Sequence, residues 1–434
     1  MNIKYWRHPG VLLSVLLLKT SSVLAQDAAA TPTLNSGDIA WMIVSTALVL
    51  FMTPGLALFY GGMVRRKNVL STIMQSMVAI PVLSVLWLVV GYSLAFSPTH
   101  GGWIGGFDWA FLRGVGQSAN PDYAPTVPHN LFMVFQCMFA VITPPLVTGA
   151  FAERMKFSSY LVFIIAWSLL IYSPLAHWVW GVGGMLRTQG VLDFAGGLVV
   201  HLSAGVSALA AALVFGPRVD YGKTEAVPYS PVLVMMGTAV LWFGWFGFNA
   251  GSAIGSNDIA ALAFANTHFA AAAAAVVWMA SEWAARGKPT LVGTCIAMVV
   301  GLAAVTPAAG FIDHFSALAI GAATSIISFG VTSIRAKSKL DDTLDVFACH
   351  GISGIVGVLA TGLLSSKSIN AAATDGGSEF FMTQLKAVLI VGAFCFVMTF
   401  VILKVIDAVM GLRPSPEDEE KGLDQTQHGE VVEG

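Results

Sequence analysis

Charged residues are scarce in this 434-residue chain, and their scarcity excludes most soluble folds. Asp, Glu, Lys and Arg make up 11% of the sequence, whereas a soluble domain usually carries about 25%. Hydrophobic residues make up 56%, and the mean hydropathy is +0.76. This composition predicts an all-α integral membrane protein that is embedded in a lipid bilayer. The formal net charge of −2 argues against a nucleic acid as a partner.

Cysteines are also few, and no two of them have the spacing that is typical of a metal-binding pair. Cys137, Cys295, Cys349 and Cys395 all fall in apolar stretches without a Cys-x-x-Cys pair, which argues against a disulfide framework and a zinc site. The chain also lacks a His-Glu-x-x-His sequence. We therefore expect no metal, no cofactor and no enzymatic activity.

The N-terminus has the pattern of a secretory signal peptide. A basic start with Lys4 and Arg7 precedes a short apolar run at 11–18, and Ala25 fits a cleavage site. The run is shorter than the about 20 residues needed to cross a bilayer, so residues 1–25 are predicted to be removed. The alternative is a short first membrane helix. Cleavage leaves the mature N-terminus outside.

The remaining apolar stretches break into eleven predicted spans within a membrane domain at 26–410. Their ranges are 39–62, 69–96, 130–151, 159–180, 194–215, 230–252, 259–282, 290–308, 315–334, 344–364 and 384–410. With an outside N-terminus, each inside loop carries at least two Lys or Arg residues, whereas the outside loops carry only Arg113, Arg187 and Lys367. This asymmetry obeys the positive-inside rule. It predicts a multi-pass protein of the bacterial inner membrane with a cytoplasmic C-terminus.

Two histidines interrupt long uncharged apolar stretches in similar local sequences. His201 lies in segment 193–205 and His350 in segment 345–354, and a glycine follows each of them four residues later. An ionisable side chain inside a bilayer is costly and usually marks a pathway, and the glycines permit close helix packing. Because the two lie five spans apart, we expect an inverted 5+5 repeat plus a final helix, with a solute site between the halves. The alternative is a pair of structural histidines bonded between helices.

Aromatic residues gather near the predicted outer ends of two spans. Trp178 and Trp180 end the fourth span, and a run of rings and glycines at 242–252 ends the sixth. One interpretation is the belt that tryptophan forms at a membrane interface. The other is an aromatic box for a small cation, worth about 0.5–2 kcal/mol per contact, with the Ser252 hydroxyl as a hydrogen-bond acceptor. A third mid-span histidine, His268, is expected to pack against neighbours or to bond another subunit.

Several long segments resemble the ammonium transporters of the Amt/Mep/Rh superfamily, specifically the bacterial Amt type. The segments run from the first span to the tail, at 59–68, 149–154, 193–205, 244–252, 345–354 and 411–413. The resemblance implies a homotrimer of eleven-helix subunits, each with its own pore for ammonium or ammonia.

The resemblance also implies roles for eight residues. They are Trp180, Phe135 and Ser252 in an outer recruitment site, Phe139 and Phe248 as a gate, His201 and His350 in the pore, and Asp193 as a structural acid near the site. Independently of the resemblance, Asp193 is predicted to cap the fifth span, because a carboxylate is favoured at the positive end of a helix.

A transport mechanism follows from solvation. A bare ammonium ion in an apolar lumen faces a limiting cost of tens of kcal/mol, whereas neutral ammonia does not. A path that demands deprotonation also rejects potassium, which has no proton to give. The two alternatives are an ammonium sensor that conducts little and an integral-membrane enzyme that uses the histidine pair.

The tail at 411–434 differs in composition from the rest of the chain, with an acidic run at 417–420. One interpretation is a solvated acidic appendage. The resemblance implies instead a cytoplasmic regulatory tail, which meets neighbouring subunits and a PII-type nitrogen-signalling protein.

Overall fold

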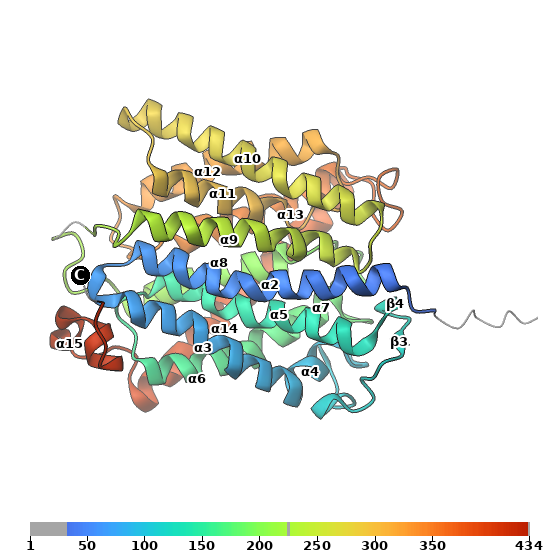
Figure 1. Ribbon diagram of the computed structural model, residues 1–434, viewed down its shortest axis with the longest axis horizontal. Helices are drawn as coiled ribbons and strands as arrows, with labels where there is room; N and C mark the ends of the chain where they lie inside the picture. The colour runs from blue at the N-terminus through green and yellow to red at the C-terminus, as the bar shows by residue number, and fades with distance from the viewer. Residues whose placement is uncertain (1–32, 224–225, 433–434) are drawn as a thin grey trace, which may run out of the picture.

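The computed structural model describes residues 33–223 and 226–432, and within them long helices run side by side in one bundle (Figure 1). The predicted signal peptide lies outside the described residues. In chain order the elements are α2 (Ser36–Met63), η1 (Arg66–Asn68), α3 (Val69–Leu86), η2 (Trp87–Gly91), α4 (Tyr92–Phe96), β1 (Thr99–His100), β2 (Ile104–Gly105), η3 (Ala110–Leu112), β3 (Ala119–Asn120), β4 (Ala124–Pro128), α5 (His129–Val147), η4 (Thr148–Ala150), α6 (Phe157–Trp167), η5 (Ser168–Tyr172), α7 (Ser173–Trp180), η6 (Gly197–Leu202), α8 (Ser203–Phe215), α9 (Pro231–Ala250), η7 (Gly251–Ala253), α10 (Asp258–Arg286), α11 (Leu291–Val305), α12 (His314–Arg335), η8 (Phe347–Gly351), α13 (Ile352–Leu364), α14 (Ser378–Met410), α15 (Pro416–Lys421) and η9 (Asp424–His428).

Ten helical segments in the described ranges are long and apolar enough to cross a membrane. Together with the shorter α11 they follow the eleven predicted spans in order, and the all-α membrane fold is confirmed. With only 15 residues, α11 is about 22 Å long, and buried turns at 306–312 extend it. The count of eleven crossings stays a prediction, because α11 alone is shorter than a bilayer's hydrocarbon of about 30 Å.

Polar caps fix where several of the helices begin. Side-chain oxygens of Asn35, Ser230, Asn257, Thr290 and Asp313 each accept a hydrogen bond from a backbone N–H in the first turn of the following helix. Such caps satisfy N–H groups that have no partner within the helix. These caps therefore fix the residue at which each of these helices begins, which a long apolar stretch does not specify.

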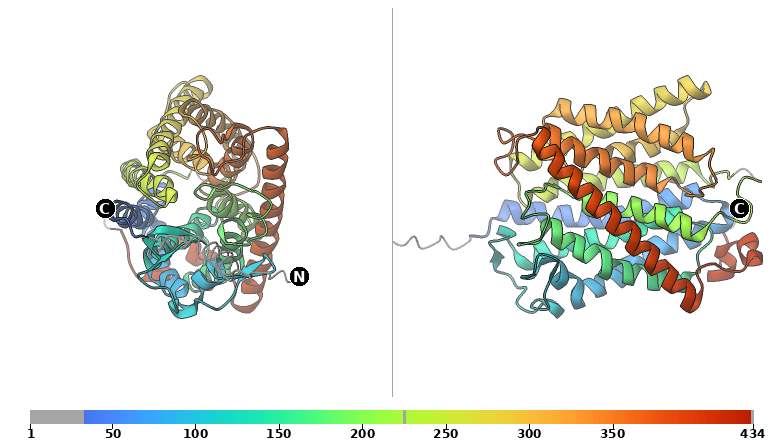
Figure 2. Two further views of the ribbon diagram at one scale, coloured as in Figure 1. Left: turned by 90° about the vertical axis from the view of Figure 1, so that its right-hand side faces the viewer. Right: turned by 180° about the vertical axis from the view of Figure 1, so that it is seen from behind.

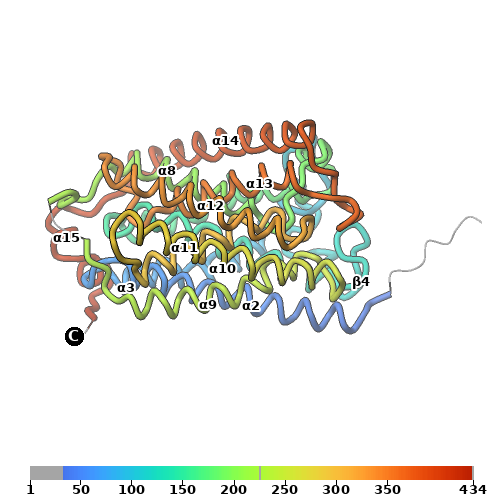
Figure 3. The backbone as a smooth tube through the Cα atoms, turned by 90° about the horizontal axis from the view of Figure 1, so that it is seen from above, coloured from blue at the N-terminus to red at the C-terminus, as the bar shows by residue number. Residues whose placement is uncertain are grey.

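The two ends of the bundle are built differently. The ribbon of β3 and β4 lies at one end and α15 at the other (Figure 1). The long helix α14 crosses the back of the bundle obliquely (Figure 2) and lies on the side opposite α2 and α9 (Figure 3). One end therefore carries the extended loops between α4 and α5, and the other carries the tail.

The tail is folded against the basic loops and is not a solvated appendage. Glu419 and Asp424 are buried. The Asp424 carboxylate accepts hydrogen bonds from the backbone N–H groups of Leu70 at 3.1 Å and Ser71 at 2.8 Å, at the start of α3. Lys67 donates to the Glu419 carbonyl at 3.1 Å. The interpretation of a free acidic tail is therefore wrong for the described residues.

A buried charge network holds the loops together at the tail end. Arg218 pairs with Asp341 at 2.9 Å and with Glu153 at 3.3 Å, and Arg65 also pairs with Glu153. Arg154 donates to the Asp341 carbonyl at 2.5 Å. These arginines come from loops that the positive-inside rule assigned to one side of the membrane, and the structure brings those loops to one end.

Candidate functional site

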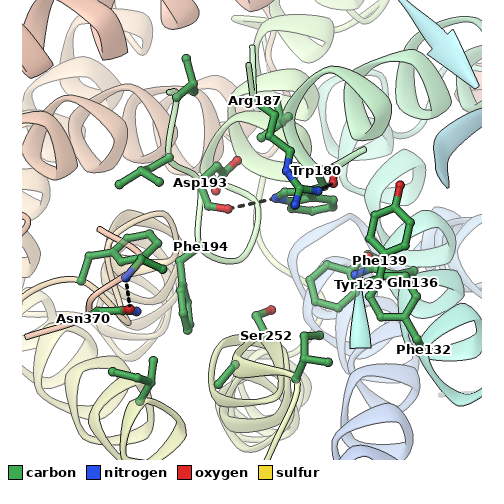
Figure 4. Close-up of a pocket in the computed structure, with 18 of the residues that line it drawn as sticks. Tyr123, Phe132, Gln136, Phe139, Trp180, Arg187, Asp193, Phe194, Ser252 and Asn370 are labelled. Atoms are coloured by element: carbon green, nitrogen blue, oxygen red, sulfur yellow. Dashed lines mark hydrogen bonds between the residues drawn. The ribbon is translucent and has the colours of Figure 1, made fainter. Parts of the chain in front are cut away.

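A cavity of about 490 Å³ is lined in part by Asp122 and Tyr123, which lie between β3 and β4. It therefore lies toward the end of the bundle opposite the tail. Figure 4 shows that its wall combines rings with a few polar side chains. The lining includes the predicted residues Trp180, Phe139, Ser252 and Asp193, together with Tyr123, Phe132, Gln136, Arg187, Phe194 and Asn370. We call this space the outer cavity.

Trp180 is held in place at the last position of α7. Its indole N–H donates to the neighbouring Asp193 carbonyl at 2.9 Å, which fixes the nitrogen-bearing edge of the ring. The ring meets that of Phe139 edge-on, with centroids 6.0 Å apart at 86°. The indole therefore lines the outer cavity in a fixed orientation.

Ser252 lies in the short η7 turn after α9. Its hydroxyl donates to the Phe248 carbonyl at 2.8 Å. With its proton used there, the oxygen keeps its lone pairs for a donor in the cavity. Ser252 can therefore act as the acceptor that the sequence predicted.

The gate candidates stack beneath the outer cavity. The rings of Phe139 and Phe248 have centroids 4.2 Å apart, and the Phe135 ring packs edge-on against Phe139 at 5.0 Å. Phe135 is fully buried against Phe139 and is not among the described residues that line the outer cavity, so its place in the recruitment site stays a prediction. Phe132 and Gln136 of the same helix line the cavity instead. The helical periodicity of the sequence does not by itself show which of these neighbouring residues on α5 faces the cavity.

A second, much smaller space lies below the ring pair. It measures about 10 Å³, close to the minimum of roughly 10–15 Å³ that holds one water molecule. Apart from the two histidines and Trp245, aliphatic side chains and phenyl rings form its wall: Met52, Leu56, Phe59, Ile142, Leu146, Val200, Leu241, Phe248 and Val299. The Trp245 N–H is already used, because it donates to Thr306 at 3.0 Å. We call this space the lumen.

His201 and His350 meet in the lumen, as the sequence predicted. Their Nδ1 atoms lie 3.3 Å apart, and the rings are nearly parallel at 14°. One Nδ1 must donate and the other must accept, since two protonated or two bare nitrogens cannot form this bond. The Nε2 of His201 is buried and has no partner in the part of the chain that the structure describes. A small polar solute in the lumen would find a hydrogen-bonding atom there.

Glycines set the distance between the helices that carry the pair. A Cβ added to Gly205 would lie 2.0 Å from the backbone nitrogen of Gly351, and one on Gly354 would lie 2.7 Å from the Gly197 carbonyl. The predicted close packing at Gly205 and Gly354 is therefore confirmed. Each histidine also lies in a π-helical turn, η6 or η8, that continues into an α-helix.

Two buried aspartates cap these turns. Asp193 accepts hydrogen bonds from the backbone N–H groups of residues 196–199 at 2.7–3.3 Å, although Gly196 occupies the N-cap position itself. Asp342 accepts from Val346 at 3.1 Å and Phe347 at 2.8 Å. Burial raises the pKa of both carboxyls, that of Asp342 to about 6. Each aspartate precedes its histidine by eight residues.

Asp342 is a site residue that the sequence analysis missed. The sequence analysis aligned Asp345, the first residue of segment 345–354, with Asp193. In the structure, however, Asp345 has a φ of +56° and pairs with Arg335 at 2.6 Å. The spacing of eight residues to the histidine was the signal that identifies Asp342. Gln136, Arg187 and Asn370 of the outer cavity were also missed as site residues.

The other mid-span histidine lies apart from both spaces. His268 is exposed on α10, and its ring contacts Trp242 with centroids 5.4 Å apart. Within residues 33–223 and 226–432, no group of three or more His, Cys, Asp or Glu side chains is placed to hold a metal ion.

Comparisons with known proteins agree over nearly the whole chain. The profile of the Ammonium Transporter Family matches residues 40–433. An ammonium transporter from Bacillus subtilis is 46% identical over 402 residues, which are 92% of this chain and 98% of the relative. Mep2 of Saccharomyces cerevisiae has a crystal structure that superposes with a TM-score of 0.83 at 33% identity, over 91% of this chain and 90% of that one. A structure described as a sensor Amt protein superposes with a TM-score of 0.82 at 29% identity, over 90% and 98%.

Proposed function

The chain belongs to the ammonium transporter family, and from that premise we propose that it carries ammonium nitrogen in two stages. The outer cavity binds the intact ammonium ion, and neutral ammonia then passes through the lumen. The observation that carries this proposal is the pair of spaces itself: a roomy, partly polar cavity of about 490 Å³ above an apolar lumen of about 10 Å³.

Recruitment depends on a ring face and an acceptor. Trp180 lines the cavity, and a cation bound over the indole face gains about 0.5–2 kcal/mol. The Ser252 oxygen accepts one N–H of the ion, because its own proton is bonded to Phe248. Phe135 acts from behind, where its packing keeps the Phe139 ring in position.

Phe139 and Phe248 form the gate. Phe139 lines the outer cavity and Phe248 lines the lumen, so this ring pair separates the two spaces. The rings must move apart for a solute to pass, and while closed they keep bulk water out of the lumen.

Deprotonation at the gate gives selectivity. None of the described residues that line the lumen is a carboxylate, and the limiting cost of an unsolvated ion there is tens of kcal/mol. Ammonium avoids this cost by transferring one proton to solvent water in the outer cavity, which leaves neutral ammonia, whereas potassium has no proton to transfer. Ammonia then exchanges hydrogen bonds with the imidazoles, and the unpartnered Nε2 of His201 is the first atom available to it. Asp193 holds the turn that carries His201 and does not touch the solute.

The assembly and its surroundings are proposed on the resemblance to the superfamily. The protein forms a homotrimer in the bacterial inner membrane, with its N-terminus outside and its tail in the cytoplasm, where a PII-type protein binds. It needs no cofactor and is not an enzyme. The exposed ring of His268 on α10, beside the exposed Phe264 and Phe269, provides a surface for subunit contact.

A sensor role is the second candidate, because the sensor Amt protein shares the fold at 29% identity. Curated transporters are more similar, at up to 46% identity. The transporter function is therefore favoured, and a flux measurement separates the two.

The test is a current and flux measurement on purified protein in supported membranes and vesicles, with pulses of ammonium, methylammonium and potassium. Wild-type protein should respond to ammonium and not to potassium. His201→Ala and His350→Ala should lose most of the ammonium response or begin to pass potassium. His100→Ala is the control, because it removes an exposed imidazole that lines neither the outer cavity nor the lumen. Wild-type flux and wild-type potassium rejection in both lumen variants would contradict the pore assignment.

A further inference from the structure

Arg187 is a cationic side chain in the wall of a cavity that we assign to a cation. It lies in the loop after α7 and is one of the lining residues of the outer cavity (Figure 4). Arg65, Arg218 and Arg335 at the other end of the bundle each pair with a carboxylate. In the described part of the chain, no carboxylate lies within ion-pair distance of Arg187. Its charge is therefore not locally neutralised.

Arg187 joins the two aromatic walls of the outer cavity. Its guanidinium donates to the Trp180 carbonyl and lies 6.0 Å from the centroid of the Tyr123 ring. Tyr123 is itself fixed, because its hydroxyl donates to the Phe96 carbonyl at 2.8 Å and accepts from the Val182 N–H at 2.9 Å. The Tyr123 ring is therefore already in contact with a cation of the protein itself, the Arg187 guanidinium.

The other ionisable groups of the cavity leave this charge uncompensated at close range. Burial raises the pKa of Tyr123 to about 12, so the phenol stays neutral. The Asp193 carboxylate is turned toward the backbone N–H groups of η6. Asp122 lines the rim and is exposed, as Arg187 is, so water and salt screen both charges in part.

We propose that Arg187 sets the affinity of the outer cavity for cations. Its fixed charge opposes the binding of ammonium, and its contact with Tyr123 leaves Trp180 as the partly exposed ring beside the substrate, because Phe139 is buried against Phe248. The inference rests on the proposed recruitment site. Two unit charges a few ångströms apart near a protein surface repel enough to raise the half-saturating concentration about two- to tenfold.

The test compares Arg187→Gln and Arg187→Lys in a transport assay over a range of ammonium concentrations. Glutamine keeps an N–H donor for the Trp180 carbonyl and removes the charge, whereas lysine keeps the charge. Arg187→Gln should lower the half-saturating concentration about two- to tenfold, with a smaller change in maximal rate, and Arg187→Lys should shift it less. Raising the ionic strength from about 0.02 to 0.2 M with an N-methylglucamine salt should lower the wild-type value, because the Debye length shrinks to below about 10 Å. Arg187→Gln should lose this salt dependence.

Several outcomes overturn the proposal. A half-saturating concentration in Arg187→Gln that equals or exceeds the wild-type value shows that Arg187 is a structural clamp on Trp180. A wild-type value that does not fall with salt contradicts the repulsion even if the variants fail to fold. Trp180→Leu, measured in the same assay, distinguishes a failure of the proposed recruitment site from a failure of the role proposed for Arg187. If it leaves the half-saturating concentration unchanged, the recruitment site itself fails; if it raises that value while Arg187→Gln does nothing, only the role of Arg187 fails.

Discussion

The outer cavity measures about 490 Å³ and the lumen about 10 Å³, and one pair of phenylalanine rings stands between them. The cavity combines indole and phenol rings with amide, hydroxyl and guanidinium groups, whereas the lumen offers a solute little besides two imidazoles. A cation gains from the first environment and loses its hydration without compensation in the second. The difference indicates a division of labour, in which the cavity sets affinity and the lumen sets rate and selectivity.

The largest expected effect comes from forcing the lumen helices apart. Gly205→Ala places a Cβ 2.0 Å from the Gly351 backbone nitrogen, next to His350. Because backbone cannot give way as a flexible side chain can, the cost should reach or exceed the usual overpacking range of about 1–3 kcal/mol. We expect a lower melting temperature and loss of most ammonium transport.

Gly392→Ala on α14 is the matched control, since nothing lies within 4 Å of the added Cβ. Equal melting temperatures and equal transport for the two alanine variants would show that the close helix crossing does not determine the lumen.

Removing one gate ring should partly erase the difference between the two spaces. In Phe248→Ala the ring that stacks on Phe139 at 4.2 Å is lost, so the cavity and the lumen join and water can follow. We expect measurable potassium uptake in vesicles and a stability cost of about 3–5 kcal/mol. Phe315→Ala, at an exposed position of α12, serves as the control. Complete potassium rejection by folded Phe248→Ala protein would mean that the lumen is selective without its ring barrier.

A smaller effect is expected from Asp342, the cap on the tail side of the histidine pair. Burial raises its pKa to about 6, above the ordinary value for aspartate. A raised folded-state pKa stabilises the protein below about pH 4, and this stabilisation is lost as the pH rises through about 6. Asp342→Asn removes this contribution, which is on the order of 1–3 kcal/mol.

Melting curves in detergent from pH 4 to 8 measure the effect. Wild-type protein should lose stability relative to Asp342→Asn between pH 4 and 6, and the two curves should run parallel above pH 7. Curves that stay parallel over the whole range would contradict the assigned shift.

The smallest effect on transport is expected from the tail, which touches neither space. Deleting the residues after Pro416 removes Asp424 and its bonds to the start of α3, a cap of about 0.5–2 kcal/mol. Transport should stay close to that of the full chain, while capture of a PII-type protein should be lost. The measurement is a PII pull-down with transport assays on both forms. Equal capture and equal inhibition would show that the tail takes no part in regulation.

The sequence predicted the helical architecture because apolar runs of about 20 residues in a membrane permit little else. Loop charges and the spacing of His201 and His350 then predicted that these two side chains meet. The glycines at 205 and 354 predicted the close crossing. These features depend on local composition and on topology, which a sequence carries directly.

Other features depend on long-range packing that no local pattern records. Phe135 and Gln136 are neighbours on one helix, and only contacts with other helices decide which of them meets the cavity. The short α11 is completed by buried turns, and the acidic tail is buried by partners more than 340 residues away. Arg187 was assigned to an outside loop, and its position over Tyr123 became visible only in the folded chain.

The most direct test of the division of labour is a double-variant cycle with Trp180→Leu and His201→Ala. Ammonium transport is measured over a range of concentrations for wild-type protein, both single variants and the combination. The account predicts that Trp180→Leu raises the half-saturating concentration with little change in maximal rate, that His201→Ala lowers the maximal rate or admits potassium, and that the two effects combine independently. If both variants change the same parameter, or if the combination deviates strongly from independence, the two spaces do not perform separate steps and the account is wrong.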